Sequence, residues 1–227
     1  MIRFYPGCLP LLAVFGLLIF VPIFFAHVML AALSKLGLTP QVALLALMGI
    51  IFGGSVDIPF KRIPREEEYI VDPLMLFGFG RIFPRLRVIR GYTTLAINVG
   101  GCLIPCALAL YQCVRITARG PAAVLVLVMV SLMSVGVCCR LARPVPGVGI
   151  AMPALIPPLV AAIPSVLLMP DFAAPIAFVA GVAGPLIGAD LLHLGDIKYV
   201  PTGMASIGGA GTFDGIVLSG LIAALLA

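Results

Sequence analysis

The feature that most constrains this chain is a series of long apolar runs separated by short polar breaks. The runs span about 18 to 25 residues, the length that an α-helix needs to cross roughly 30 Å of hydrocarbon. Apolar and polar residues do not alternate along them, as they would in the strands of a membrane barrel. The sequence therefore predicts an all-α fold, a polytopic transmembrane helical bundle forming a single domain over residues 1–227.

About seven spans follow from reading the runs in order. We expect helices at 9–33, 39–56, 92–114, 121–139, 150–169, 173–193 and 212–227. Apolar residues make up 62% of the chain and charged residues only 10%, a balance that a soluble domain does not reach. The segments 39–56 and 150–169 are the two that could be re-entrant rather than spanning.

The distribution of Lys and Arg predicts the orientation, because cations are retained on the cytoplasmic side. With the N-terminus inside, eleven of them face the cytoplasm and three, Lys35, Arg115 and Arg119, face the opposite side. Seven of the eleven lie in the loop 57–91, which is thus predicted to be a basic cytoplasmic loop. These counts favour an N-in, C-out protein of the inner (plasma) membrane with multiple passes.

The formal charge of +5 does not indicate a nucleic-acid partner, because the cations cluster in loops and form no groove interleaved with aromatic residues. The basic loop 57–91 could bind anionic lipid headgroups, although a role in setting the topology explains it as well. Cys102 and Cys106 share a helical face and could ligate a metal, but packing is the favoured interpretation since no other ligand is near. The sequence predicts no metal and no cofactor.

Two carboxylates inside predicted spans are the candidate chemistry. Asp190 and Asp214 lie near the cytoplasmic ends of the last two helices, in the region 148–227 that we take as the functional core. A charged side chain in hydrocarbon costs a few kcal/mol and therefore marks a functional site unless a partner explains it. Two carboxyls held close share a proton, which leaves one as base and one as acid, the catalytic pair of aspartyl peptide hydrolysis.

Structural roles compete with this interpretation. Asp214 could cap a helix N-terminus, and Gly184 with Gly188 has the spacing of a helix-contact motif. The functional interpretation makes Gly188, Gly211 and Gly215 positions where a substrate backbone approaches closely. His193 follows Asp190 by three residues and could hydrogen-bond to it or contact substrate.

Several stretches resemble the membrane family known as domain of unknown function 1614. They are Gly54–Pro59, Ile97–Pro105, Arg143–Pro153, Leu186–Leu194 and Ser206–Leu226. This resemblance implies a polytopic membrane protein and brings no activity with it.

A second resemblance, to the intramembrane aspartyl proteases of the presenilin and signal-peptide-peptidase type, rests on shorter motifs. The sequence GTFDG around Asp214 looks like their Gly-x-Gly-Asp helix, and Asp190 then matches the aspartate of the preceding helix. Pro153, Ala154 and Leu155 reproduce their Pro-Ala-Leu tripeptide. The resemblance implies that Asp190 and Asp214 are catalytic and that the tripeptide contributes to substrate binding.

Two other functions remain open. Glycine- and proline-broken helices with buried carboxylates also suit a transporter or channel in which the aspartates couple to protons or ions. In a non-catalytic assembly subunit, the aspartates would only pack. The expected partners are membrane lipids, a transmembrane peptide substrate under the protease interpretation, and a second copy in a homo-oligomer.

Overall fold

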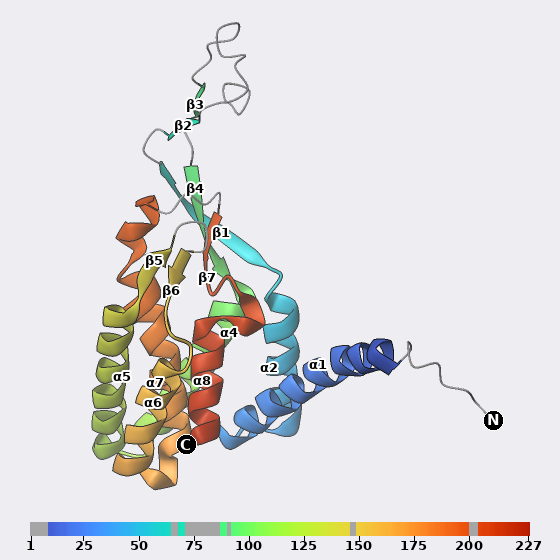
Figure 1. The fold of residues 1–227 in the computed structure, drawn as a ribbon. Coiled ribbons are helices and arrows are strands. Elements are labelled where there is room, and N and C mark those ends of the chain that lie inside the picture. The colour runs from blue at the N-terminus through green and yellow to red at the C-terminus, as the bar shows by residue number, and fades with distance from the viewer. Residues whose placement is uncertain (1–8, 65–67, 71–86, 90–91, 146–148, 200–203) are drawn as a thin grey trace, which may run out of the picture.

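The computed structural model describes residues 9–64, 68–70, 87–89, 92–145, 149–199 and 204–227. Helices dominate this part of the chain, and strands gather at one end of the helical layer (Figure 1). Four helical segments are long and apolar enough to cross a bilayer: Ala13–Lys35, Val99–Thr117, Pro121–Leu141 and Pro170–Asp196. They identify a membrane protein. Three further apolar helices, Pro40–Gly53, Ile156–Leu168 and Gly215–Leu226, are shorter.

The helices lie close to the positions that the apolar runs predict. They are α1 (Leu9–Lys35), α2 (Pro40–Gly53), α4 (Ile104–Thr117), α5 (Pro121–Leu141), α6 (Ile156–Leu168), α7 (Ala173–Ala183) and α8 (Gly215–Leu226). Proline stands in the first turn of α2, α4, α5 and α6, where its missing N–H costs no hydrogen bond. Thr39 caps α2 by accepting a hydrogen bond from the Val42 N–H at 3.5 Å.

Two helices contain π-helical turns, in which each backbone hydrogen bond joins residues five positions apart instead of four. Segment η2 (Val99–Leu103) leads into α4, and η4 (Gly184–Leu191) continues α7. The short 3₁₀ segments are η3 (Pro170–Phe172), η5 (Leu194–Tyr199) and η6 (Gly211–Phe213). Because π-helical turns are concentrated at functional sites, η4 draws attention to the residues that it carries.

The strands were not predicted. A three-stranded sheet has the order β1 (Asp57–Pro64), β4 (Tyr92–Asn98), β7 (Met204–Ile207), with β1 antiparallel and β7 parallel to β4. The prediction of a helix from residue 92 is therefore wrong over its first seven residues, which form β4. Two smaller pairs are β2 (Glu68–Ile70) with β3 (Arg87–Ile89) and β5 (Arg143–Val145) with β6 (Gly149–Ala151). The remainder of the basic loop lies outside the described residues.

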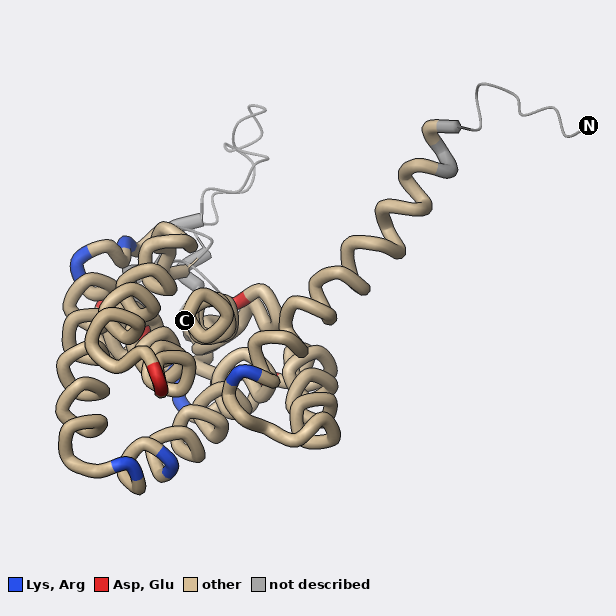
Figure 2. Tube along the Cα trace, turned by 90° about the horizontal axis from the view of Figure 1, so that it is seen from below, with Lys and Arg blue, Asp and Glu red and all other residues tan. Residues whose placement is uncertain are grey.

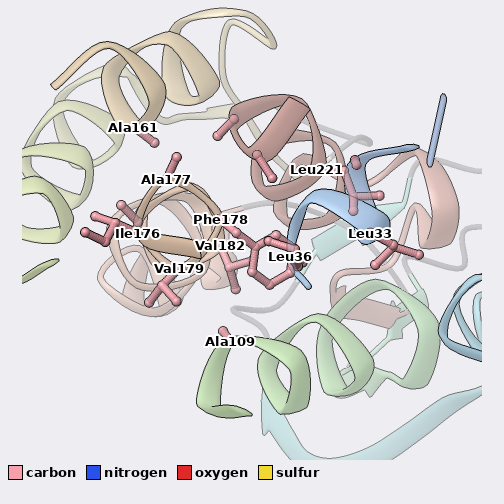
Figure 3. Packing of buried hydrophobic residues seen from close by; sticks show 14 of the residues in the cluster. Leu33, Leu36, Ala109, Ala161, Ile176, Ala177, Phe178, Val179, Val182 and Leu221 are labelled. Atoms are coloured by element: carbon pink, nitrogen blue, oxygen red, sulfur yellow. The ribbon is translucent and has the colours of Figure 1, made fainter. Parts of the chain in front are cut away.

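Helix α7 is the centre of the helical layer and packs against α4, α5, α6 and α8 (Figure 3). Ile176, Phe178 and Val182 are almost completely buried there. Small residues allow α8 to approach closely, since a Cβ on Gly181 would meet the Ser219 carbonyl oxygen at 2.8 Å. Such close packing supplies the attraction between helices that lipid cannot supply through the hydrophobic effect.

Helix α1 leaves the bundle, as both views show (Figures 1 and 2). Its N-terminal half exposes large apolar side chains such as Phe15, Leu18 and Phe20. Its last turns join the core through Met29, Ala32 and Leu33, which are buried. The helices seen in Figure 2 carry few charged residues, as expected for segments whose solvent is lipid.

Candidate functional site

A cavity of about 540 Å³ lies where the strands meet the helices. Its walls come from β6, the connection between β7 and α8, the first turn of α8, and η4. Three carboxylates line it: Asp57, Asp190 and Asp214. The two aspartates singled out in the sequence thus face one space, and the structure adds a third.

Asp214 lies between η6 and α8, in extended backbone with ψ of 150°. Its Oδ1 accepts a hydrogen bond from the Ile216 N–H at 2.9 Å, and its Oδ2 accepts one from the Ala210 N–H at 3.3 Å. The residue is therefore the N-cap of α8, as its structural interpretation predicted. Capping holds the carboxylate rigidly while one side of it remains open to the cavity.

Asp190 is carried by the π-helical segment η4 and is partly buried. Asp190 lines the same cavity as Asp214, and Gly208, which has no side chain, contributes its backbone to the wall beside them. His193 does not bond to Asp190; it donates from Nδ1 to the carbonyl oxygens of Gly188 at 3.1 Å and Ala189 at 3.0 Å.

Asp57 is the residue that sequence reasoning missed. It is the first residue of β1, and its Oδ1 accepts hydrogen bonds from the Ser206 hydroxyl and from Asn98 Nδ2. It appeared in the sequence as one charge among many in a basic loop. The signal that could have found it is its apolar surroundings, because Val56, Ile58 and Pro59 flank it while the basic residues begin only at Lys61.

Three Gly-Gly pairs cross behind the cavity: Gly53–Gly54, Gly100–Gly101 and Gly208–Gly209. A Cβ on Gly101 would overlap the carbonyl oxygen of Gly208, and one on Gly100 would overlap the backbone of Gly54. Gly208 also has φ of +74°, a conformation that side-chain-bearing residues rarely adopt. Glycine is thus what lets three chain segments meet through their backbones at this site.

The predicted substrate-binding residues divide into two groups. Ala154 and Gly215 line the cavity with Asp190 and Asp214, whereas Pro153 and Leu155 are exposed beside it. Gly211 has φ of +59° and packs on Gly54.

Gly188 is buried against α5, where an added Cβ would overlap the Val135 carbonyl oxygen. Gly184 likewise packs on Ser134 of α5. Both glycines therefore lie in a helix contact, which the spacing of the pair indicated as the alternative to substrate binding.

The sulfur atoms of Cys102 and Cys106 are 4.0 Å apart on consecutive turns, at the junction of η2 and α4. Within the described ranges, no group of three or more His, Cys, Asp or Glu side chains is placed to hold a metal ion. Cys102 is buried and Cys106 partly so, and both face the core between α4 and its neighbours.

Comparison with known proteins gives one match. The family model described as a protein of unknown function (DUF1614) matches residues 51–226. No curated protein and no solved structure matches the chain. The matched region begins near the end of α2 and includes every residue that lines the cavity.

Proposed function

The chain belongs to the DUF1614 family, which has no assigned activity, and we propose from its site that it is an intramembrane aspartyl protease with Asp190 and Asp214 as the catalytic pair. The observation that carries this proposal is that both aspartates line one cavity together with Ala154 of the Pro-Ala-Leu tripeptide. These residues come from three separate elements, the β6–α6 connection, η4 and the start of α8. Their convergence is what a peptide-cleaving site at membrane depth requires.

The chemistry needs one carboxylate and one carboxylic acid. The carboxylate takes a proton from a water molecule as the water oxygen attacks the scissile carbonyl carbon, and the acid protonates the carbonyl oxygen. The tetrahedral diol then collapses: one of its hydroxyls gives its proton to the ionised carboxylate as the C=O re-forms, the C–N bond breaks, and the departing nitrogen takes a proton from the protonated carboxyl. Two neighbouring carboxyls supply this combination because their charges repel and they share one proton.

Water and substrate both have room in the cavity. A volume of about 540 Å³ compares with roughly 30 Å³ for one water molecule in the liquid. The residues Ser206–Ala210 and Gly149–Met152 form much of the wall, so an extended peptide in the cavity would lie beside both segments. Irregular backbone at membrane depth is tolerated where it lines such a water-filled space.

We further propose seven crossings with the N-terminus in the cytoplasm, in the inner membrane. The cations assigned to the outer side lie together at the end of the bundle away from the strands. Lys35 donates to the Leu225 carbonyl at 2.7 Å, Arg115 donates to the Leu36 carbonyl, and the Arg119 guanidinium lies 4.5 Å from the Phe172 ring centroid. Arg62, Arg140 and Arg143 belong to elements at the opposite end, as an N-in topology requires.

A transporter is the second candidate. The helix of Asp190 changes at Gly184 and Pro185 from the α-helical α7 to the π-helical η4, and transporters also bind ions at irregular stretches of their helices. Proton or ion coupling through Asp190 and Asp214 would then replace peptide hydrolysis.

Cleavage of a transmembrane-peptide library by the purified protein tests the proposal. Wild type is expected to cleave some members and to be blocked by a transition-state inhibitor of aspartyl proteases. Asp190→Asn and Asp214→Asn are each expected to be inactive, whereas Asp171→Asn, an exposed aspartate at the other end of the bundle, retains activity.

Cleavage that persists in Asp190→Asn or in Asp214→Asn contradicts the protease proposal. Absence of cleavage together with aspartate-dependent proton or ion flux in liposomes supports the transporter instead.

A further inference from the structure

We propose that Asp57 is a positioning residue that holds β7, and with it the backbone of Gly208, in place beside Asp190 in the cavity wall. The inference rests on the proposed protease function of Asp190 and Asp214. It concerns a residue at the far edge of the sheet from β7, in a segment that the sequence showed only as part of a basic loop.

The strand register places the two partners on one face of the sheet. Asp57 on β1 pairs with Asn98, and Ser206 on β7 pairs with Ala96, two residues earlier on the central strand β4. Directly paired residues point to the same side, so all four side chains share a face. The small Ala96 leaves space above β4, and the Ser206 hydroxyl reaches over it to donate to Asp57 Oδ1.

Asn98 fixes the position of the Asp57 carboxylate. It is fully buried, and its Nδ2 donates to the Gly54 carbonyl at 2.9 Å and to Asp57 Oδ1 at 3.1 Å. Its own Oδ1 accepts a hydrogen bond from the Gly101 N–H at 2.7 Å. Through Asn98, Asp57 is thus anchored to the Gly54 carbonyl at the end of α2 and to the Gly101 N–H of η2.

A second series of contacts also connects Asp57 to the segment after β7, through Asn98 and Gly101. Gly101, which Asn98 holds, packs against the backbone of Gly208, and Gly208 follows Ser206 by two residues. Strand β7 has only four residues and pairs with β4 alone, so its ladder gives limited restraint. The Asp57–Ser206 hydrogen bond and the Gly101–Gly208 contact therefore hold this segment at two points, Ser206 and Gly208, where it lines the cavity with Asp190.

A positioning role predicts different effects for two substitutions at residue 57. The carboxylate acts through Oδ1, which accepts from two neutral donors, and an amide oxygen can accept the same hydrogen bonds. Asp57→Asn should therefore preserve function, whereas Asp57→Ala should not. A third carboxylate that took part in the proton chemistry would instead lose its role in both variants.

The experiment combines two readouts on the full chain in detergent micelles. Hydrogen exchange of residues 204–211 is expected to accelerate about fivefold to tenfold in Asp57→Ala and in Ser206→Ala, the effect of losing one hydrogen bond. With a cleaved transmembrane peptide as substrate, kcat is expected to fall about 10-fold to 100-fold while KM stays within about twofold, because geometry and not binding is lost. Asp57→Asn and the exposed neighbour variant Ser55→Ala should match wild type.

The double variant Asp57→Ala/Ser206→Ala should be no worse than Asp57→Ala, since the hydrogen bond that Ser206→Ala removes is already lost in that variant. Unchanged exchange over 204–211 in both alanine variants would overturn the proposal, as would an Asp57→Asn protein as impaired as Asp57→Ala. If wild type cleaves no peptide, the protease proposal fails by itself, and the exchange measurement still decides whether Asp57 holds β7.

Discussion

Gly101 and Gly208 meet backbone to backbone, so a Cβ on Gly101 would overlap the carbonyl oxygen of Gly208. Neither partner is a flexible side chain that could move aside. The crossing joins η2 to the segment that lines the cavity with Asp190, and it has direct consequences for stability.

Gly101→Ala is expected to destabilise the protein by about 2 to 3 kcal/mol, because overpacking against backbone forces a chain shift. Gly136→Ala on α5 is the matched control, since a Cβ there meets nothing within 4 Å. It should leave stability unchanged or raise it by up to about 1 kcal/mol through helix propensity. Unfolding in a denaturing detergent measures the stability of both variants. Equal stability of the two would contradict a close Gly101–Gly208 backbone contact.

Gly188→Ala is expected to act on stability rather than on substrate selection. The added methyl group would overlap the Val135 carbonyl of α5 and cost about 1 to 3 kcal/mol. Gly195→Ala, at a position with open space around it, should cost no more than about 0.5 kcal/mol. Thermal unfolding measures the stability of both variants. A Gly188→Ala protein with normal stability and an altered peptide preference would favour the substrate-binding interpretation.

The two roles of Asp214 can be separated. Asp214→Ala should lose about 1 kcal/mol of stability with the cap of α8, whereas Asp214→Asn should retain stability because Asn caps equally well. Both should lose peptide cleavage. Thr39→Ala removes the cap of α2 and should lower stability while leaving cleavage intact, so parallel unfolding and cleavage assays distinguish capping from catalysis.

Single cysteines introduced into a background without the native ones test the orientation. Arg119→Cys should react with a membrane-impermeant maleimide in intact cells, and Arg143→Cys should react only after permeabilisation. Both side chains are exposed and belong to opposite ends of the bundle. The reverse pattern would invert the topology.

The helices could be predicted because their signal is local. An apolar run of sufficient length has few alternatives in lipid, and the prolines at 40, 121 and 157 mark helix starts wherever the rest of the chain lies. The glycine spacing of 184 and 188 also gave the helix contact with α5, although it did not identify the partner helix. Asp190 and Asp214 stood out because charge inside an apolar run is conspicuous.

The strand β4 was missed because its apolar residues, Leu95–Ile97, lead directly into the apolar run of the next helix, and so short a stretch does not distinguish a strand from the first turn of a helix. Its hydrogen-bond partners are Asp57–Pro64 and Met204–Ile207, far away on both sides in the sequence. Tyr92, Thr93 and Thr94 favour a strand, and Asn98 before Gly-Gly indicates a helix start, yet neither signal is strong by itself.

From the sequence one could predict a helical membrane protein, the positions of most of its helices, and the two carboxylates that stand inside apolar runs, because each of these depends on residues close together in the chain. Tertiary structure alone decided that Asp190 and Asp214 share a cavity with Ala154, that Asp57 joins them, and that His193 bonds to carbonyls instead. These outcomes depend on strand register, on a π-helical turn and on glycine crossings, in which segments far apart in the chain satisfy each other's backbone groups.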